Sequence, residues 1–152
     1  MGSPLEVSAM FMGEYNHSID EKGRLIIPSR FRYELGENFV LTKGLDGCLC
    51  IYPKTDWDDL MEKLHSLPLT NRNARKITRF LVSGAVACEL DKQGRILVPA
   101  SLRSHAGITK DVVLTGNLDR IEVWDKARWD EYSSYDDVED IAESLADSGI
   151  MI

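Results

Sequence analysis

The nine residues DEKGRLIIP at positions 20–28 return as DKQGRILVP at positions 91–99, with the acid, glycine, arginine and proline each kept in register. The match continues without a gap from 20–36 to 91–107. Six aligned pairs are identical: Asp20/Asp91, Gly23/Gly94, Arg24/Arg95, Pro28/Pro99, Arg32/Arg103 and Gly36/Gly107. Similarity of this extent indicates an internal duplication of one unit, at roughly 20–57 and 91–129.

The residue types in each copy predict the same short elements. Asp-x-x-Gly fits a hairpin loop, because the Asp side chain accepts hydrogen bonds from turn amides and Gly adopts a positive φ. Proline then ends the strand at the start of a short helix, which the last glycine of the match terminates. The predicted strands are 14–19, 24–27, 38–42 and 48–52 in the first copy and 87–90, 95–98, 111–115 and 120–124 in the second.

One unit is too small to bury a stable core alone, and the chain supplies two. We therefore predict an α+β, β-rich fold, in which two hairpin units form an intramolecular pseudo-dimer. In this prediction the units interleave into a small β-barrel with helices packed outside. We assign the first unit and its helices to 10–83 and the second unit to 84–152, and we interpret 1–9 as an added leader.

Three longer helices are predicted between and after the repeated elements. The first has Thr55 as its expected cap and ends before Pro68. The last, within 136–149, carries a narrow apolar stripe on an acidic background and suits docking on a partner or on the body of the fold. The middle helix has a basic face made of Arg72, Arg75, Lys76 and Arg79. This face fits a solvated surface, contact with phosphate, or pairing with the acidic C-terminal helix of a neighbouring copy.

The charge distribution leaves room for a basic patch in an acidic chain. The formal net charge is −7, yet residues 10–83 hold 11 basic side chains against 10 acidic ones. Residues 128–152 hold one arginine and eight acidic side chains. The acidity is therefore mainly a property of the C-terminal region.

The repeated turn suggests a surface that binds nucleic acid. Asp20 and Arg24 are spaced to pair across the mouth of the hairpin, with Lys22 at its tip. Arginine reads guanine, while lysine and backbone amides bind phosphates. Candidate DNA-binding residues are Asp20, Lys22, Gly23, Arg24, Arg30, Asp91, Lys92, Gly94 and Arg95, and Arg32 could extend the patch. The alternative is a protein-interaction scaffold in which Asp20 and Arg24 only clamp the turn.

Catalytic and metal-binding patterns are absent from the sequence. It has no glycine-rich phosphate loop after a strand, no nucleophile elbow and no cluster of ligands at metal spacing. Cys48, Cys50 and Cys88 form neither a paired disulfide framework nor a CxxC motif. We predict a protein that is not an enzyme, with no cofactor, no metal and no small-molecule substrate. No run reaches the ~18 apolar residues that a membrane helix needs.

Three stretches together resemble the MraZ family of bacterial transcriptional regulators: MFMGEYNHSIDEKGRLIIPSRFR (10–32), LPLT with ARKITRFLVSGA (67–70 and 74–85), and DKQGRILVPASLR (91–103). The resemblance implies tandem AbrB-like (SpoVT-AbrB) swapped-hairpin domains and a ring-shaped homo-oligomer. It also implies a cytoplasmic, nucleoid-associated protein that binds short G-rich DNA repeats upstream of the division and cell-wall gene cluster.

The family's DNA-contacting motif falls on Asp20, Lys22, Gly23 and Arg24 and on Asp91, Gly94 and Arg95, as the resemblance implies. The second copy departs at one place, because Gln93 stands where the first copy has Lys22 and its lysine, Lys92, lies one residue earlier. The second turn could therefore serve partly as structure. Other AbrB-like folds pair with a toxin, so an antitoxin-like regulator remains the further alternative.

Overall fold

The computed structural model of the chain describes residues 10–152, and the predicted leader at 1–9 lies outside the described residues. The two repeats have the same order of elements. The first contains β1 (Glu14–Ser18), β2 (Arg24–Ile26), α1 (Ser29–Leu35), β3 (Phe39–Lys43), the one-turn helix η1 (Leu45–Gly47) and β4 (Leu49–Pro53). The second contains β5 (Val86–Cys88), β6 (Arg95–Leu97), α4 (Ala100–Ala106), β7 (Asp111–Gly116) and β8 (Ile121–Asp125).

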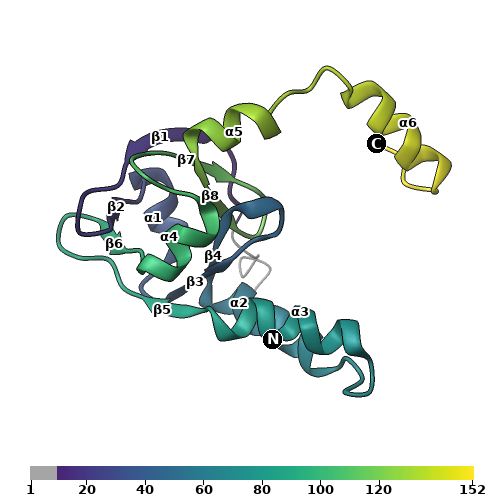
Figure 1. Cartoon of the computed structure of the whole chain (residues 1–152), viewed down its shortest axis with the longest axis horizontal. Helices are drawn as coiled ribbons and strands as arrows, with labels where there is room; N and C mark the ends of the chain where they lie inside the picture. The colour runs from purple at the N-terminus through teal and green to yellow at the C-terminus, as the bar shows by residue number, and fades with distance from the viewer. Residues whose placement is uncertain (1–9) are drawn as a thin grey trace, which may run out of the picture.

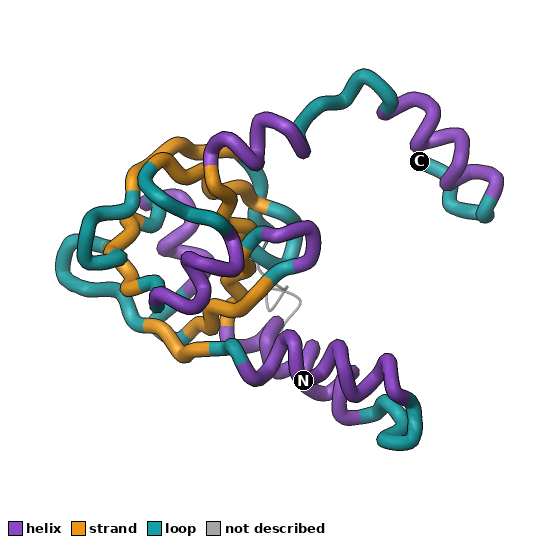
Figure 2. The backbone as a smooth tube through the Cα atoms, viewed as in Figure 1, coloured by secondary structure: helices purple, strands orange, loops and turns teal. Residues whose placement is uncertain are grey.

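Four further helices complete the fold: α2 (Lys54–His65), α3 (Arg72–Ser83), α5 (Lys126–Tyr132) and α6 (Val138–Asp147). Helices α2 and α3 form a hairpin between the repeats that projects from one end of the body (Figures 1 and 2). Helix α6 stands away from the body beyond α5 (Figure 1). None of the helices in residues 10–152 is long and apolar enough to cross a membrane.

Each repeat donates its first strand to the sheet of the other repeat. The main sheet has six antiparallel strands in the order β1-β7-β8-β4-β3-β5. Strand β1 thus pairs with β7, whereas β5 pairs with β3. The short strands β2 and β6 pair with each other as a separate two-stranded ribbon. This exchange confirms the predicted swapped-hairpin units and the α+β class.

The small β-barrel that was predicted is not closed, because the six-stranded sheet of the described chain is open at β1 and β5. After β1 ends at Ser18, Ile19 forms an isolated antiparallel bridge with Leu25. The three-residue strands β2 and β6 pair with each other as a separate ribbon and do not extend the hydrogen-bonded ladder of the six-stranded sheet. The sheet therefore curves around a core without closing into a cylinder.

The core draws matching side chains from both repeats. Leu25 and Ile27 of the first repeat are fully buried, and so, within a few per cent, are their counterparts Ile96 and Val98. The short helices add Phe31 and Leu102, which are also buried. Because one hydrophobic cluster contains all these residues, neither repeat has a core of its own.

Helix boundaries follow the predicted glycines but not the predicted cap. Gly36 and Gly107 end α1 and α4 with positive φ values of 70° and 63°. Helix α2 begins at Lys54, directly after Pro53, so Thr55 lies within the helix and does not cap it. Proline there fixes a φ of −56° that leads into the helix without a capping side chain.

Candidate nucleic-acid interface

The first repeated turn is held by a single carboxylate. Oδ1 of Asp20 accepts hydrogen bonds from the backbone N–H groups of Lys22 and Arg24, both at 2.9 Å. Oδ2 accepts from Nε of Arg24 at 2.7 Å. Gly23 has a φ of 84°, and its N–H donates to the carbonyl of Asp20 at 3.0 Å. The predicted pairing of Asp20 with Arg24 is confirmed.

The second turn repeats this geometry. Oδ1 of Asp91 accepts from the N–H groups of Gln93 at 2.8 Å and Arg95 at 2.9 Å, and Oδ2 accepts from Nε of Arg95 at 2.8 Å. Gly94 has a φ of 74°. The two turns are therefore built alike despite the change from Lys22 to Gln93 at the tip.

These hydrogen bonds keep both carboxyl groups charged. Hydrogen bonding from the backbone N–H of Arg24 lowers the pKa of Asp20 below its usual value, and the pairing with the Arg24 side chain adds to this. The corresponding groups of Arg95 lower the pKa of Asp91. At neutral pH each turn thus holds an ionised acid against a guanidinium group.

Arg24 and Arg95 lie on the same face of the β2–β6 ribbon. In the antiparallel register Arg24 is opposite Leu97, and Ile26 is opposite Arg95. The alternate residues Leu25 and Ile96 are buried in the core, so the two arginines belong to the outer face. Their side chains are 37% and 24% exposed. Within residues 10–152 only Nε of each guanidinium has a hydrogen-bond partner, which leaves the two Nη groups of each available.

A second pair of repeated arginines ties each turn to the opposite repeat. Nε of Arg32 donates to the carbonyl of Ile27 at 2.8 Å, and its guanidinium lies against Gly94. Nε of Arg103 donates to the carbonyl of Val98 at 3.1 Å and lies against Gly23. Arg32 therefore supports the second turn from the first repeat. Sequence analysis missed this role, although identity at both positions was the available signal.

Gly23 and Gly94 are required because a side chain would have no room there, as well as because φ is positive at both positions. A Cβ atom on Gly23 would lie 2.8 Å from the carbonyl oxygen of Val98, and a Cβ on Gly94 would collide with the Arg32 guanidinium. The same glycine carbonyls accept from the N–H groups of Val98 at 2.7 Å and Ile27 at 2.9 Å. Each turn is thus locked to the strand end of the other repeat.

The remaining candidates are exposed side chains around the turns. Lys22 is exposed at the tip of the first turn, and Lys92 is exposed in the second. Arg30 is exposed on α1, and no hydrogen bond or ion pair of the described residues joins it to either turn. The basic face of α3 lies on the projecting hairpin, away from the β2–β6 end of the molecule (Figure 1). The structure therefore brings both turns together and separates the α3 arginines from them.

One set of metal-ligand types does come together elsewhere. Donor atoms of Cys48, Cys50 and Glu122 lie within 4.8 Å of one another, because Cys50 is opposite Glu122 in the β4–β8 register. Three donors could hold a thiophilic cation, one fewer than a closed zinc site uses. However, the neighbouring Cys50 thiol and burial raise the pKa of Cys48, so this thiol is protonated at neutral pH. The sequence gives little signal for the set, since Glu122 comes from the other repeat.

Comparison with known proteins gives matches along nearly the whole described chain. The family model described as "MraZ protein, putative antitoxin-like" matches residues 10–80 and again 81–148. A protein of Thermoanaerobacter sp. (strain X514), named "Transcriptional regulator MraZ", is 57% identical over 143 residues, which cover 93% of this chain and 100% of the relative.

Two other relatives carry the same name. The protein of Caldanaerobacter subterraneus subsp. tengcongensis is 58% identical over 138 residues, covering 90% of this chain and 96% of the relative. The protein of Lachnoclostridium phytofermentans is 54% identical over 141 residues, covering 93% and 99%. These names describe regulators and no enzymatic activity. The chain therefore belongs to the MraZ family of transcriptional regulators.

Proposed function

We propose that this regulator binds double-stranded DNA through the outer face of the β2–β6 ribbon and its two turns. The observation that carries the proposal is the common face of Arg24 and Arg95, each held by its own carboxylate. A two-stranded ribbon fits the major groove of B-DNA, where arginine contacts O6 and N7 of guanine bidentately. The Nη groups of both arginines can make this contact while Nε stays on the aspartate. This chemistry agrees with short G-rich repeats as the target.

Lys22, Lys92 and Arg30 complete the proposed interface as phosphate contacts. These side chains are exposed, and phosphate contacts position a protein on DNA without reading sequence. Gly23 and Gly94 give each turn its positive φ and its close contact with the opposite repeat, and so hold the two turns in place for the duplex. Asp20 and Asp91 hold the two arginines in place and are not themselves expected to touch the phosphates, which would repel them.

The proposal also assigns the chain to a homo-oligomer, as a ring, that binds several repeats upstream of the division and cell-wall gene cluster. One ribbon offers few phosphate contacts, so a single copy should bind weakly and lose affinity quickly with salt. When several copies are joined, each further contact becomes intramolecular and the overall affinity rises by ~10²-fold or more. The proposal puts the protein in the cytoplasm, associated with the nucleoid.

Fluorescence anisotropy with duplexes that carry one or several G-rich repeats tests the proposal. Arg24→Ala and Arg95→Ala should each weaken binding at least about tenfold, because a bidentate guanine contact contributes ~1–3 kcal/mol. Arg72→Ala removes the same charge from an exposed position on α3 and should have little effect. Circular dichroism and light scattering establish that each variant keeps its fold and mass.

Two outcomes would favour the other candidates. If Arg24→Ala unfolds the protein or dissociates the oligomer, the turn is a clamp and the scaffold hypothesis gains. If the chain purifies from its native host with a small basic protein that blocks the ribbon face, the antitoxin-like function that the family description names is supported. Equal affinity for one repeat and for several would remove the argument from multivalency.

A further inference from the structure

The α2–α3 hairpin carries an apolar groove with a volume of about 870 Å³. Its apolar lining residues are Met61, Leu64, Leu67, Pro68, Leu69, Ala74 and Val82. Several of them face water, and Leu69 is 85% exposed. A contiguous apolar surface of this kind on a single copy marks a contact with another molecule.

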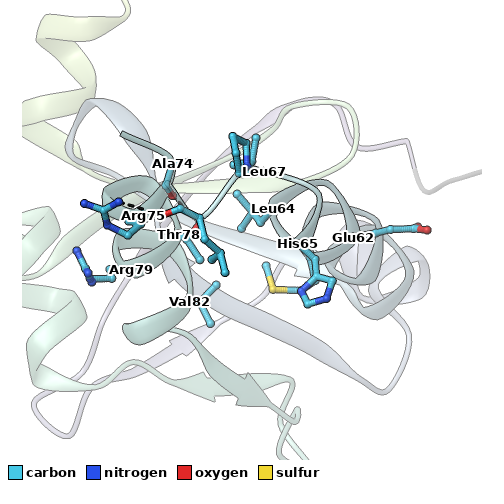
Figure 3. A pocket seen from close by; sticks show the side chains of 12 residues that line it. Glu62, Leu64, His65, Leu67, Ala74, Arg75, Thr78, Arg79 and Val82 are labelled. Carbon is cyan, nitrogen blue, oxygen red and sulfur yellow. Dashed lines mark hydrogen bonds between the residues drawn. The ribbon is translucent and has the colours of Figure 1, made fainter. Parts of the chain in front are cut away.

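One edge of the groove is basic. Arg75 and Arg79, one helical turn apart on α3, both line it, and in Figure 3 their side chains lie together on one side. Glu62 points away from the groove on the other side (Figure 3). An occupant of this groove should therefore be apolar along its centre and acidic along one edge.

Helix α6 has this composition. Val138, Ile141, Ala142 and Leu145 follow the i, i+3, i+4, i+7 spacing of a single helical face. Glu139 lies at the edge of that face, whereas Asp140, Glu143 and Asp147 lie on the far side of the helix. Val138 and Ile141 are each 49% exposed, and no residue of α6 is buried.

The isolated position of α6 indicates that it needs a partner. A helix of ten residues is marginal in water without tertiary contacts. The helix is joined to α5 by five residues, 133–137, which span at most ~18 Å when extended. In Figure 1 α6 stands apart from the α2–α3 hairpin, with α6 at the upper right and the hairpin at the lower right. These positions favour a groove on another copy over the helix's own groove.

We propose that α6 of one copy docks in the α2–α3 groove of the next copy, with its apolar face on the groove floor and Glu139, at the edge of that face, against Arg75 and Arg79. This inference rests on the homo-oligomer of the proposed function and names the contact that builds it. Each copy has one α6 helix and one α2–α3 groove, so it can contact one neighbour through the helix and another through the groove. Such a contact is head to tail. Head-to-tail contacts close into rings when the rotation between copies allows it.

Light scattering and sedimentation of the full chain test the contact. Ile141→Ala with Leu145→Ala removes two apolar anchors and should convert the oligomer to monomers at micromolar concentration. Asp140→Ala with Asp147→Ala truncates two residues on the opposite side of the same helix and should leave the mass unchanged. An apolar-face variant that keeps the mass of the unaltered protein overturns this contact while the DNA-binding proposal stands.

Charge reversal shows whether the contact is made between copies. Arg75→Glu with Arg79→Glu should dissociate the oligomer, and so should Glu139→Arg. Mixing the two dissociated variants should restore mixed oligomers, because every helix then meets a groove of opposite charge. Failure of the mixture to assemble overturns the proposed pairing.

Two controls keep the outcomes separate. The body of each variant should melt as the unaltered chain does, because no residue of α6 is buried and Arg75 and Arg79 are exposed on α3. Each monomeric variant should still bind a single DNA repeat as weakly as one copy is expected to. A monomeric unaltered chain would overturn both the oligomer and this contact, whereas loss of single-repeat binding points to damage at the ribbon.

Discussion

The two turns of the ribbon share one scaffold and differ at their tips. Both have an aspartate that accepts three hydrogen bonds, a glycine with positive φ and an arginine paired through Nε. The tip has Lys22 in the first turn and Gln93 in the second, and Arg95 is less exposed than Arg24. The comparison separates residues that the fold requires in both turns from tip residues that can differ between them.

The largest expected effect is the loss of stability when Gly23 or Gly94 is replaced by alanine, and this loss should differ between the two turns. Gly23→Ala brings Cβ to 2.8 Å from a backbone carbonyl, whereas Gly94→Ala meets the end of the movable Arg32 side chain. Both substitutions also strain a positive φ. We expect losses in the free energy of unfolding of about 3 kcal/mol for Gly23→Ala and about 2 kcal/mol for Gly94→Ala.

Urea unfolding of both variants, with unchanged m values, measures this order. Each variant is the control for the other, since both add one methyl group at a positive φ. Equal losses would show that the Val98 carbonyl yields as easily as the Arg32 side chain, and the two turns would then be equivalent scaffolds.

An exchange of the tip residues should change DNA binding without changing stability. Gln93→Lys adds one phosphate contact to the second turn and should steepen the slope of log K against log salt by about 0.9. Lys22→Gln should make the slope shallower by a similar amount. Anisotropy titrations on a single-repeat duplex over a salt series measure both slopes. Unchanged slopes would mean that the tips lie away from the phosphates.

The smallest expected effect is the pH dependence of stability that comes from Asp20 and Asp91, because both carboxyl groups are already ionised at neutral pH. In the unfolded chain an aspartate has a pKa of about 3.9, and the turn hydrogen bonds lower the pKa of Asp20 and Asp91 in the fold. Their stabilising effect is therefore fully present above about pH 4 and is lost as the pH falls through the lower folded pKa.

NMR of the side-chain carboxyl carbons follows both groups directly. The two aspartates should titrate alike and below the ordinary value, because their hydrogen bonds match. A titration of Asp91 at or above the ordinary value, with Asp20 below it, would show that the second turn is open in solution.

Sequence alone predicted what depends on neighbouring residues. The Asp-x-x-Gly turns, the pairing of Asp20 with Arg24 and the glycines that end α1 and α4 all follow from local hydrogen bonds and backbone conformation. DNA contact by these residues stays a prediction. The duplication also predicted that the two units interleave, because neither unit could bury a core alone, and the resemblance to the MraZ family implied swapped hairpins.

Contacts that depend on the exchange of first strands between the repeats could not be predicted from short stretches of sequence. Arg32 was predicted to extend the basic patch, and no role was predicted for Arg103. The structure places each of them against the turn of the opposite repeat, because the exchanged strands bring them there. The barrel is not closed for a similar reason, since β2 and β6 pair with each other and are not part of the six-stranded sheet. Cys50 and Glu122 meet only through the pairing of β4 with β8.

The exchange of first strands also sets when the protein can fold during translation. Strand β1 leaves the ribosome early, but its partner β7 exists only after residues 111–116 have been synthesised. The N-terminal half therefore waits with its edge unpaired while most of the chain is made, although domains commonly fold N-terminal first as they emerge. A stalled or truncated nascent chain would thus expose an incomplete sheet, and only a finished copy can become a regulator.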